Sequence, residues 1–330
     1  MKRRTVLQLA AAMLAAPGRS FAQAPRRFRI GCLWATSEKA AGNYAKAFLM
    51  GLRELGYVEG RNLVVDMRWA YGDSSRFAVL AEELIALKPD VLVGVEQPAV
   101  AMKSRTATIP IVLLASTDPV AAGLVRSLAR PGTNVTGFAY QLGVLVGKNI
   151  ELLTEIAPKM KHIALFNYET LANDPAASAT KLYAQVAKET SEAKKLALVV
   201  VSARDKEGVG RAFMVLEKER PEGLVVAATA PLFQLASEIV GQARRLRLPA
   251  ICGLPGWAET GGLIGYGPNF LANYRYAATY VDRILKGAKP ADMPVEQPPK
   301  FDFVVNLKTA REIGIRIPQS ILLRADRVIE

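Results

Sequence analysis

The chain has 330 residues, of which 51% are hydrophobic and 22% are charged, and its net charge is +13 at pH 7. These proportions are typical of a folded globular protein and exclude a disordered chain. The length leaves room for two domains. Two cysteines and one histidine, His162, exclude a disulfide-dense scaffold and a metal centre built from several thiols or imidazoles.

Residues 1–24 have the layout of a secretory signal. Lys2, Arg3 and Arg4 form a basic start, a largely apolar stretch follows over 6–16, and small residues close the segment. The apolar stretch is too short to span a bilayer, which takes about 20 apolar residues. The pair Arg3-Arg4 also resembles a twin-arginine signal. The sequence therefore predicts export to the periplasm and leaves both the Sec and the twin-arginine route open.

The basic residues after this segment do not form a nucleic-acid surface. Loss of residues 1–24 lowers the net charge from +13 to +9, and the remaining basic residues are scattered beside acidic ones. The densest cluster, Arg244-Arg245-x-Arg247, is typical of a solvated helix end. No later stretch is apolar over the length that a membrane helix requires. We expect no nucleic-acid partner and no membrane span in the mature chain.

Strand and helix patterns alternate along residues 28–128. The run Phe28–Trp34 is short and apolar, as in a buried strand, and 40–55 has helical spacing that stops at Gly56. The series continues with strands expected at 62–69, 90–95 and 109–114 and helices at 76–87, 98–107 and 118–128. Strands that alternate with helices predict a parallel sheet covered by helices on both faces.

The same alternation restarts after residue 146. The expected helices lie at 147–156, 176–188, Lys206–Glu219 and 232–246, and the expected strands at 162–166, 196–201, 223–227 and 249–252. The tail adds a strand at 263–266, a helix at Phe270–Leu285, a proline-rich stretch, a strand at 301–305 and a helix at Leu307–Ile313. The two series predict an α/β protein with two Rossmann-like lobes, and the tail requires several chain crossings between them.

Polar and aromatic side chains follow the predicted strands, where doubly wound sheets bind their ligands. The candidates at these strand ends are Trp34, Thr36, Ser37, Glu96, Gln97, Ser116, Thr117, Asp118, Asn167 and Thr229. Hydroxyl and amide groups of this kind orient a small polar ligand. Thr36, Ser37 and Asp118 are equally suited to cap helices, and Trp34 to pack in a core. The convergence of these side chains on one edge of each lobe favours a binding site.

The motifs of the common enzyme classes are absent from the sequence. Neither Gly-x-Ser-x-Gly nor Gly-x-Gly-x-x-Gly follows a predicted strand, and His162 lies at the wrong end of its strand for a catalytic base. We therefore expect no enzyme and no cofactor, and no metal site. A hydrolase or transferase that uses Asp118 or Glu96 as a base stays an alternative. Cys32 and Cys252 lie in different predicted lobes, which favours two separate buried thiols and leaves pairing open.

A series of collinear motifs extends along the chain after the signal segment. It includes Gly51-Leu-Arg-Glu-Leu-Gly-Tyr-Val-Glu-Gly-Arg-Asn62, Asp118-Pro119-Val120, Leu128-Ala-Arg-Pro-Gly132, Asn134-Val-Thr-Gly137, Tyr266-Gly-Pro-Asn269 and Leu322-Leu-x-Arg-Ala-Asp326. Together these motifs resemble the substrate-binding proteins of ABC uptake transporters with a type I periplasmic-binding fold. Some members of that family bind tryptophan or other aromatic amino acids.

The resemblance implies two lobes joined by a three-segment hinge, with a small polar ligand, such as an amino acid, clamped between them. The first lobe would take 28–137 and 266–297, and the second 138–265 and 298–330. The implied hinge residues are Asn134, Thr136, Gly137, Gly265 and Tyr266. The ligand-binding residues implied by position are Thr36, Ser37, Gln97, Thr117, Asp118, Asn167 and Thr229, to which the strand-end pattern adds Trp34 and Ser116.

One departure from the family pattern concerns the ligand. Many members carry Asp-Pro-Leu-Phe where this chain has Ala230-Pro231-Leu232-Phe233. The missing carboxylate indicates that a ligand ammonium is bound differently than in those members, or that the ligand is different. The implied mechanism is closure of the lobes on the ligand and docking of a monomeric receptor on a membrane permease, with no chemical step. An exported sensor that signals to a receptor kinase stays an alternative.

Overall fold

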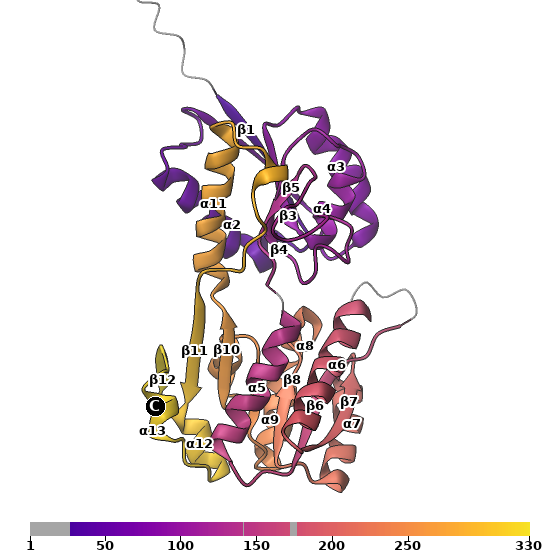
Figure 1. Cartoon of the computed structure of the whole chain (residues 1–330), viewed down its shortest axis with the longest axis vertical. Helices are drawn as coiled ribbons and strands as arrows, with labels where there is room; N and C mark the ends of the chain where they lie inside the picture. The colour runs from indigo at the N-terminus through magenta and orange to yellow at the C-terminus, as the bar shows by residue number, and fades with distance from the viewer. Residues whose placement is uncertain (1–26, 141, 172–176) are drawn as a thin grey trace, which may run out of the picture.

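Two lobes, each built on its own sheet, lie one above the other along the long axis of the molecule (Figure 1). The structure is a computed structural model that describes residues 27–140, 142–171 and 177–330, so the predicted signal segment lies outside the described residues. No helix in these ranges combines the length and the apolar character that crossing a membrane requires.

The first lobe is a five-stranded parallel sheet in the order β2-β1-β3-β4-β5. Its strands are β1 (Phe28–Trp34), β2 (Leu63–Trp69), β3 (Val91–Val95), β4 (Ile111–Ala115) and β5 (Val135–Gly137). Its helices are α2 (Glu38–Glu54), α3 (Phe77–Ala86), α4 (Glu96–Lys103) and α11 (Phe270–Leu285), with 3-10 turns η1 (Ser74–Arg76) and η2 (Pro290–Asp292). Because side chains alternate along β1, Cys32 packs with α2 and α11 and Leu33 with α3 and α4.

The second lobe is a seven-stranded sheet in the order β12-β11-β10-β9-β8-β6-β7. Its strands are β6 (His162–Tyr168), β7 (Ala197–Ala203), β8 (Gly223–Val226), β9 (Ala250–Cys252), β10 (Ile264–Pro268), β11 (Phe301–Asn306) and β12 (Arg327–Ile329). Its helices are α5 (Leu142–Ile156), α6 (Ala177–Ala193), α7 (Lys206–Glu219), α8 (Ala230–Gln234), α9 (Ala236–Arg245), α10 (Gly256–Glu259), α12 (Leu307–Ile313) and α13 (Gln319–Leu322). Only the pairing of β10 with β11 is antiparallel among these strands.

Local signals in the sequence set several helix ends. Asp205 caps α7 by accepting a hydrogen bond from the Gly208 N–H at 2.7 Å, and Asn269 caps α11 by accepting one from the Ala272 N–H at 2.9 Å. Gly314 ends α12 in the left-handed region with φ of 78°. These caps explain why the predicted bounds of α7, α11 and α12 agree with the structure.

Three chain passages join the lobes. The first runs from β5 to α5, the second from β10 through Asn269 into α11, and the third from the 293–297 segment into β11. The first and third lie side by side, because the Ala139 N–H donates to the Glu296 carbonyl at 3.0 Å and the Glu296 N–H to the Gly137 carbonyl at 3.0 Å. The second contacts the third through the Asn269 N–H, which donates to the Lys300 carbonyl at 3.0 Å.

The structure corrects the predicted position of the second passage. The family resemblance implies a hinge at Gly265 and Tyr266 and a second segment of the first lobe that begins at residue 266. Both residues instead lie within β10, where they pair with Val304 and Phe303 of β11. The chain leaves the second sheet only after Pro268. The ring of Tyr266 also packs against Phe303, with centroids 5.6 Å apart, which fixes this residue in the second lobe.

Two predicted helices differ from the structure in more than their bounds. Residues 118–128 form successive turns, because Gly123 adopts a φ of +67° and Pro119 accepts from both Leu124 and Val125, which interrupts the helical ladder. The predicted helix 232–246 is divided into α8 and α9 at Leu235, whose N–H donates to the Leu232 carbonyl three residues earlier.

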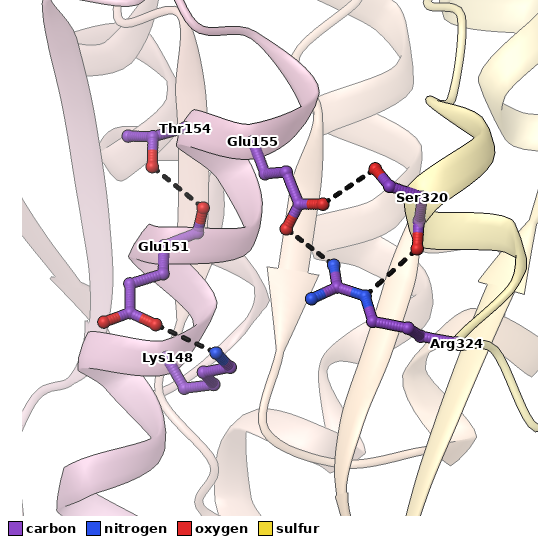
Figure 2. Close-up of polar contacts among 6 residues, drawn as sticks. All are labelled: Lys148, Glu151, Thr154, Glu155, Ser320 and Arg324. Atoms are coloured by element: carbon purple, nitrogen blue, oxygen red, sulfur yellow. Dashed lines mark hydrogen bonds and ion pairs between the residues drawn. The ribbon is translucent and has the colours of Figure 1, made fainter.

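The C-terminal helix α13 is held against α5 by a polar cluster (Figure 2). The carboxylate of Glu155 on α5 accepts from the Ser320 hydroxyl at 2.9 Å and from the Arg324 guanidinium at 2.6 Å. Earlier on α5, Lys148 and Glu151 form an ion pair at 2.9 Å. The Glu155 contacts therefore fasten the last helix to the body of the second lobe.

The two cysteines are free thiols in different sheets. Cys32 lies in β1 and Cys252 in β9, and both are buried. Burial raises the pKa of each thiol to about 12. The structure thus agrees with the prediction of two separate buried thiols.

Candidate functional site

A cavity of about 320 Å³ lies between the two lobes. The first lobe contributes β3, β4, the start of α4, the passage after β5 and the start of α11, and the second lobe contributes α6 and the segment after β8. The lining residues are Val95, Glu96, Gln97, Ala115, Ser116, Thr117, Tyr140, Phe270, Ala179, Tyr183, Ala228, Thr229 and Pro231. A molecule in this cavity would contact both lobes at once.

The polar lining comes from the ends of parallel strands. β3 ends at Val95 and is followed by Glu96 and Gln97, and β4 ends at Ala115 and is followed by Ser116 and Thr117. Because neighbouring parallel strands end at the same edge, these side chains meet there. Across the cavity, Thr229 follows β8 and caps α8 by accepting from the Leu232 N–H at 3.3 Å.

Glu96 is the one charged side chain among the described residues that line the cavity. Its Oε2 atom accepts hydrogen bonds from the Ser116 hydroxyl, from the Thr117 N–H at 2.8 Å and from the Asp118 N–H at 3.2 Å. These contacts hold the carboxylate in place at the end of β4. The cavity consequently presents a fixed negative charge.

Aromatic rings form the apolar part of the cavity. Tyr140 and Phe270 lie together in the first lobe, with centroids 5.0 Å apart, and Tyr183 faces the cavity from α6 of the second lobe. The Tyr183 hydroxyl donates to the Ala228 carbonyl at 3.3 Å. Burial raises the pKa of Tyr183, and the nearby Cys252 and Glu96 raise it further. Burial likewise raises the pKa of Tyr140, so both phenols are neutral hydroxyls at physiological pH.

A cavity between two α/β lobes with a three-segment connection has known counterparts. The family model of "ABC transporter substrate binding protein" matches residues 30–329. The chain belongs to this family. It is therefore a solute-binding receptor, and its α/β fold with two mainly parallel sheets is that of the type I periplasmic-binding proteins.

Relatives of this receptor agree with the family assignment. It is 26% identical to a tyrosine-binding protein of Clostridioides difficile (strain R20291) over 275 residues, which cover 82% of this chain and 76% of the relative. A conserved domain protein of Vibrio cholerae has a TM-score of 0.78 at 27% identity, with 92% of this chain and 100% of that chain covered. An ABC domain of Streptococcus pneumonia in complex with L-Trp has a TM-score of 0.78 at 26% identity and the same coverage.

Four of the predicted ligand-binding residues line the receptor's cavity. They are Gln97, Ser116, Thr117 and Thr229. Asp118 lies beside them, but its side chain caps the following turn, accepting from the Val120 N–H at 3.1 Å and the Ala121 N–H at 2.9 Å. Asp118 thus has the local capping role that the sequence left open, and it borders a neighbouring hollow.

The remaining predicted residues lie outside the cavity lining. Trp34 is buried between Trp69 and Tyr274, with centroids 5.3 and 6.1 Å away, as its core alternative predicted. Thr36 is exposed, and Ser37 is the N-cap residue of α2 without a side-chain capping bond. Asn167 is buried, and its amide donates to the Thr180 carbonyl at 2.8 Å, which ties β6 to α6.

The aromatic lining is not among the residues that the sequence predicts for the site. Phe270 is the first residue of α11, directly after the second passage, so a rule that inspects segments after the lobe crossings would have found it. Tyr140 follows the first passage strand β5 and carries the same signal. Tyr183 lies in the middle of α6, where a tyrosine is indistinguishable from a core residue in the sequence alone.

Proposed function

We propose that this receptor binds a small molecule with an amino group and an aromatic or apolar part, an amino acid or a relative of one, in the cavity between its lobes. One observation carries the proposal: a fixed carboxylate, hydroxyl groups and aromatic rings from both lobes line a single cavity. A carboxylate binds an ammonium group, and rings bind an apolar side chain. Relatives named for tyrosine or solved with L-Trp support this ligand class.

The proposed mechanism is closure followed by delivery. A ligand that contacts Glu96 of the first lobe and Thr229 of the second is bound fully only when the lobes are together, so binding shifts the population toward the closed form. The closed, monomeric receptor then docks on an ABC permease. No residue of the cavity needs to exchange a covalent bond, so the proposal includes no catalysis.

The proposed location is the outer side of the cytoplasmic membrane. The basic start and apolar stretch of residues 1–24 support export, by the Sec or the twin-arginine route. A sensor role would use the same cavity and differ in the partner. Neighbouring genes distinguish the two, since uptake requires a permease and an ATPase, and sensing requires a receptor kinase.

The test is a thermal-shift screen of residues 25–330 against amino acids, amines, aromatic acids, nucleosides and dicarboxylates. A ligand at 100 times its Kd adds about 2.7 kcal/mol of stability, which raises the melting temperature by several degrees. The expected hit contains an amino group and is recovered chemically unchanged. A converted hit, or hits only among dicarboxylates, would overturn the proposal.

Two threonine variants locate the binding site of such a hit. Thr117→Val removes a hydroxyl from the cavity lining, and we expect weaker binding by calorimetry. Thr154→Val makes the same change on α5, where the Thr154 hydroxyl donates to the Glu151 carbonyl (Figure 2). Thr154 is not among the residues that line the cavity. The control variant should bind as the parent does, and equal losses in both variants would argue against this cavity.

A further inference from the structure

The donors at the end of β4 are already occupied by the protein's own carboxylate. The Ser116 hydroxyl and the backbone N–H groups of Thr117 and Asp118 all converge on Oε2 of Glu96. Two N–H groups and a hydroxyl around one oxygen are what a ligand carboxylate needs, because each donor stabilises a negative charge. In this receptor these donors already bind the carboxylate of Glu96, which is itself part of the cavity wall.

The other oxygen of Glu96 is open to a ligand. No described residue donates a hydrogen bond to Oε1, and the side chain is only partly buried. The described lining contains no Lys, Arg or His. A ligand ammonium would therefore have a fixed anionic acceptor, whereas a ligand carboxylate would have no counter-charge and would face Glu96. Desolvating an unpaired charge and opposing a like charge both weaken binding.

The aromatic lining complements a cation of this kind. Tyr140 and Phe270 on one side and Tyr183 on the other place ring surfaces from both lobes around the cavity. Aromatic rings bind apolar groups and also attract an ammonium by a cation–π interaction. The described lining thus contains one negatively charged side chain and several aromatic rings, and no positively charged side chain.

We propose that the cavity selects aromatic amines that lack a carboxylate over the amino acids that carry the same side chain, with Glu96 as the residue that determines this specificity. The inference rests on the proposed function and names its ligand class. The ligand would resemble tyramine or tryptamine, in which a primary amine is joined to an aromatic group.

The test compares three probes that share one side chain. Tyramine carries only the amine, tyrosine carries the amine and the carboxylate, and 3-(4-hydroxyphenyl)propionate carries only the carboxylate. Tryptamine, tryptophan and indole-3-propionate form a second set. Calorimetry on residues 25–330 should give the tightest binding for an amine, binding weaker by at least tenfold for the amino acid, and none for the acid.

Substitutions of Glu96 test the cause of the selectivity. Glu96→Gln keeps an oxygen for the Ser116 and Thr117 donors and removes the charge, so we expect it to weaken amine binding at least tenfold. Glu96→Ala frees the three donors, so it should lose the amine and gain measurable affinity for the acid. The matched control is Glu38→Gln, which changes the first residue of α2 in the same lobe, outside the cavity. It should leave all affinities unchanged.

The experiments distinguish a failure of the specificity inference from a failure of the proposed function. An amino acid that binds as tightly as its amine, or amine binding that survives Glu96→Gln, overturns the specificity inference and leaves the receptor function standing. If none of the six probes binds, the specificity inference is wrong. If, in addition, no compound of the wider screen raises the melting temperature, the proposed ligand class is contradicted as well. Circular dichroism of each variant establishes that a loss of binding is not a loss of fold.

Discussion

Gly137 shows how a single residue fixes the path of the chain between the lobes. Its φ is +129°, and a Cβ atom at this position would lie 2.3 Å from the Leu113 carbonyl oxygen. Gly137→Ala therefore combines backbone strain with a clash against a buried strand, and we expect a loss of about 3 kcal/mol in the free energy of unfolding. Urea denaturation measures it.

The matched control is a glycine without such neighbours. Gly241 lies inside α9, and a Cβ there would have no atom within 4 Å. Gly241→Ala should stabilise the protein by up to about 1 kcal/mol, because alanine has the higher helix propensity. Equal destabilisation by the two substitutions would contradict this account of Gly137.

Tyr57 is expected to contribute stability that depends on pH in the alkaline range. Its hydroxyl donates to Asp282 of α11 at 2.9 Å, and burial together with this bond raises its pKa from 10.0 to about 12. The stabilisation is complete below the unfolded pKa and is lost as the pH rises through the folded pKa. Tyr57→Phe should cost about 1–2 kcal/mol at pH 8, and the difference from the parent should shrink between pH 10 and 12.

Urea denaturation at pH 8, 10 and 11 follows that difference. Tyr71→Phe is the control, because Tyr71 is 64% exposed. Its removal should change stability little at any of these values. If the difference in the free energy of unfolding between the parent and Tyr57→Phe does not change with pH, the ionisation of Tyr57 does not affect stability.

At the scale of the element, sequence signals predicted helices wherever local chemistry decides their ends. α7 and α11 have the predicted bounds because Asp205 and Asn269 cap them. The segment 118–128 has apolar spacing and an N-cap residue, yet Gly123 at a φ of +67° turns it out of the helix. β10 was predicted too short, because its last residues are strand only through pairing with β11, a contact that local patterns do not encode.

We expect the attachment of α13 to α5 to be weak and to depend on pH. Burial acts to raise the pKa of Glu155, but hydrogen bonds from Arg324 and Ser320 (Figure 2), together with the nearby positive charges of Arg324 and Lys148, outweigh it and lower the pKa. A lowered pKa contributes stability above the unfolded value, near 4.5, that is lost as the pH falls. The side chains of Arg324 and Glu155 are 47% and 35% exposed, so solvent screens the pair. Glu155→Gln should therefore cost less than about 1 kcal/mol at pH 7.

The measurement is urea denaturation of Glu155→Gln and the parent at pH 7 and at pH 4. The difference should shrink at pH 4 and in high salt. Glu151→Gln, one turn earlier on α5, removes the exposed pair with Lys148 and is the control for a general charge effect. If the control loses as much stability as Glu155→Gln, the contact to α13 has no special role.

At the scale of the whole molecule, topology predicted polar side chains of the site that follow strand ends, and tertiary packing supplied its aromatic rings. Gln97, Ser116, Thr117 and Thr229 were found because parallel strands end at a common edge. Tyr183 could not be found, because only the placement of α6 against the first lobe turns it toward the cavity. Trp34 was a candidate by position, but two rings from β2 and α11 enclose it.

Closure of the lobes is the motion that the proposed mechanism requires, and the chain permits a direct measurement. Thr36 follows β1 and Ser202 lies near the end of β7, so each is close to the facing edge of its own sheet, and both are exposed. Cysteines at these two positions can carry spin labels, because the native thiols of Cys32 and Cys252 are buried with pKa values raised to about 12 and react poorly. Ligand should shift the measured distance between the labels to shorter values.

A pair of labels within the first lobe is the control that distinguishes closure of the lobes from a change within a lobe. Thr36→Cys with Val79→Cys, on the exposed side of α3, should report the same distance with and without ligand. A binding event that moves neither pair would mean that the ligand reaches both walls of the cavity without hinge motion. The three passages would then act as a rigid connection, and the permease would have to recognise the ligand itself, because the receptor would present the same surface whether empty or loaded.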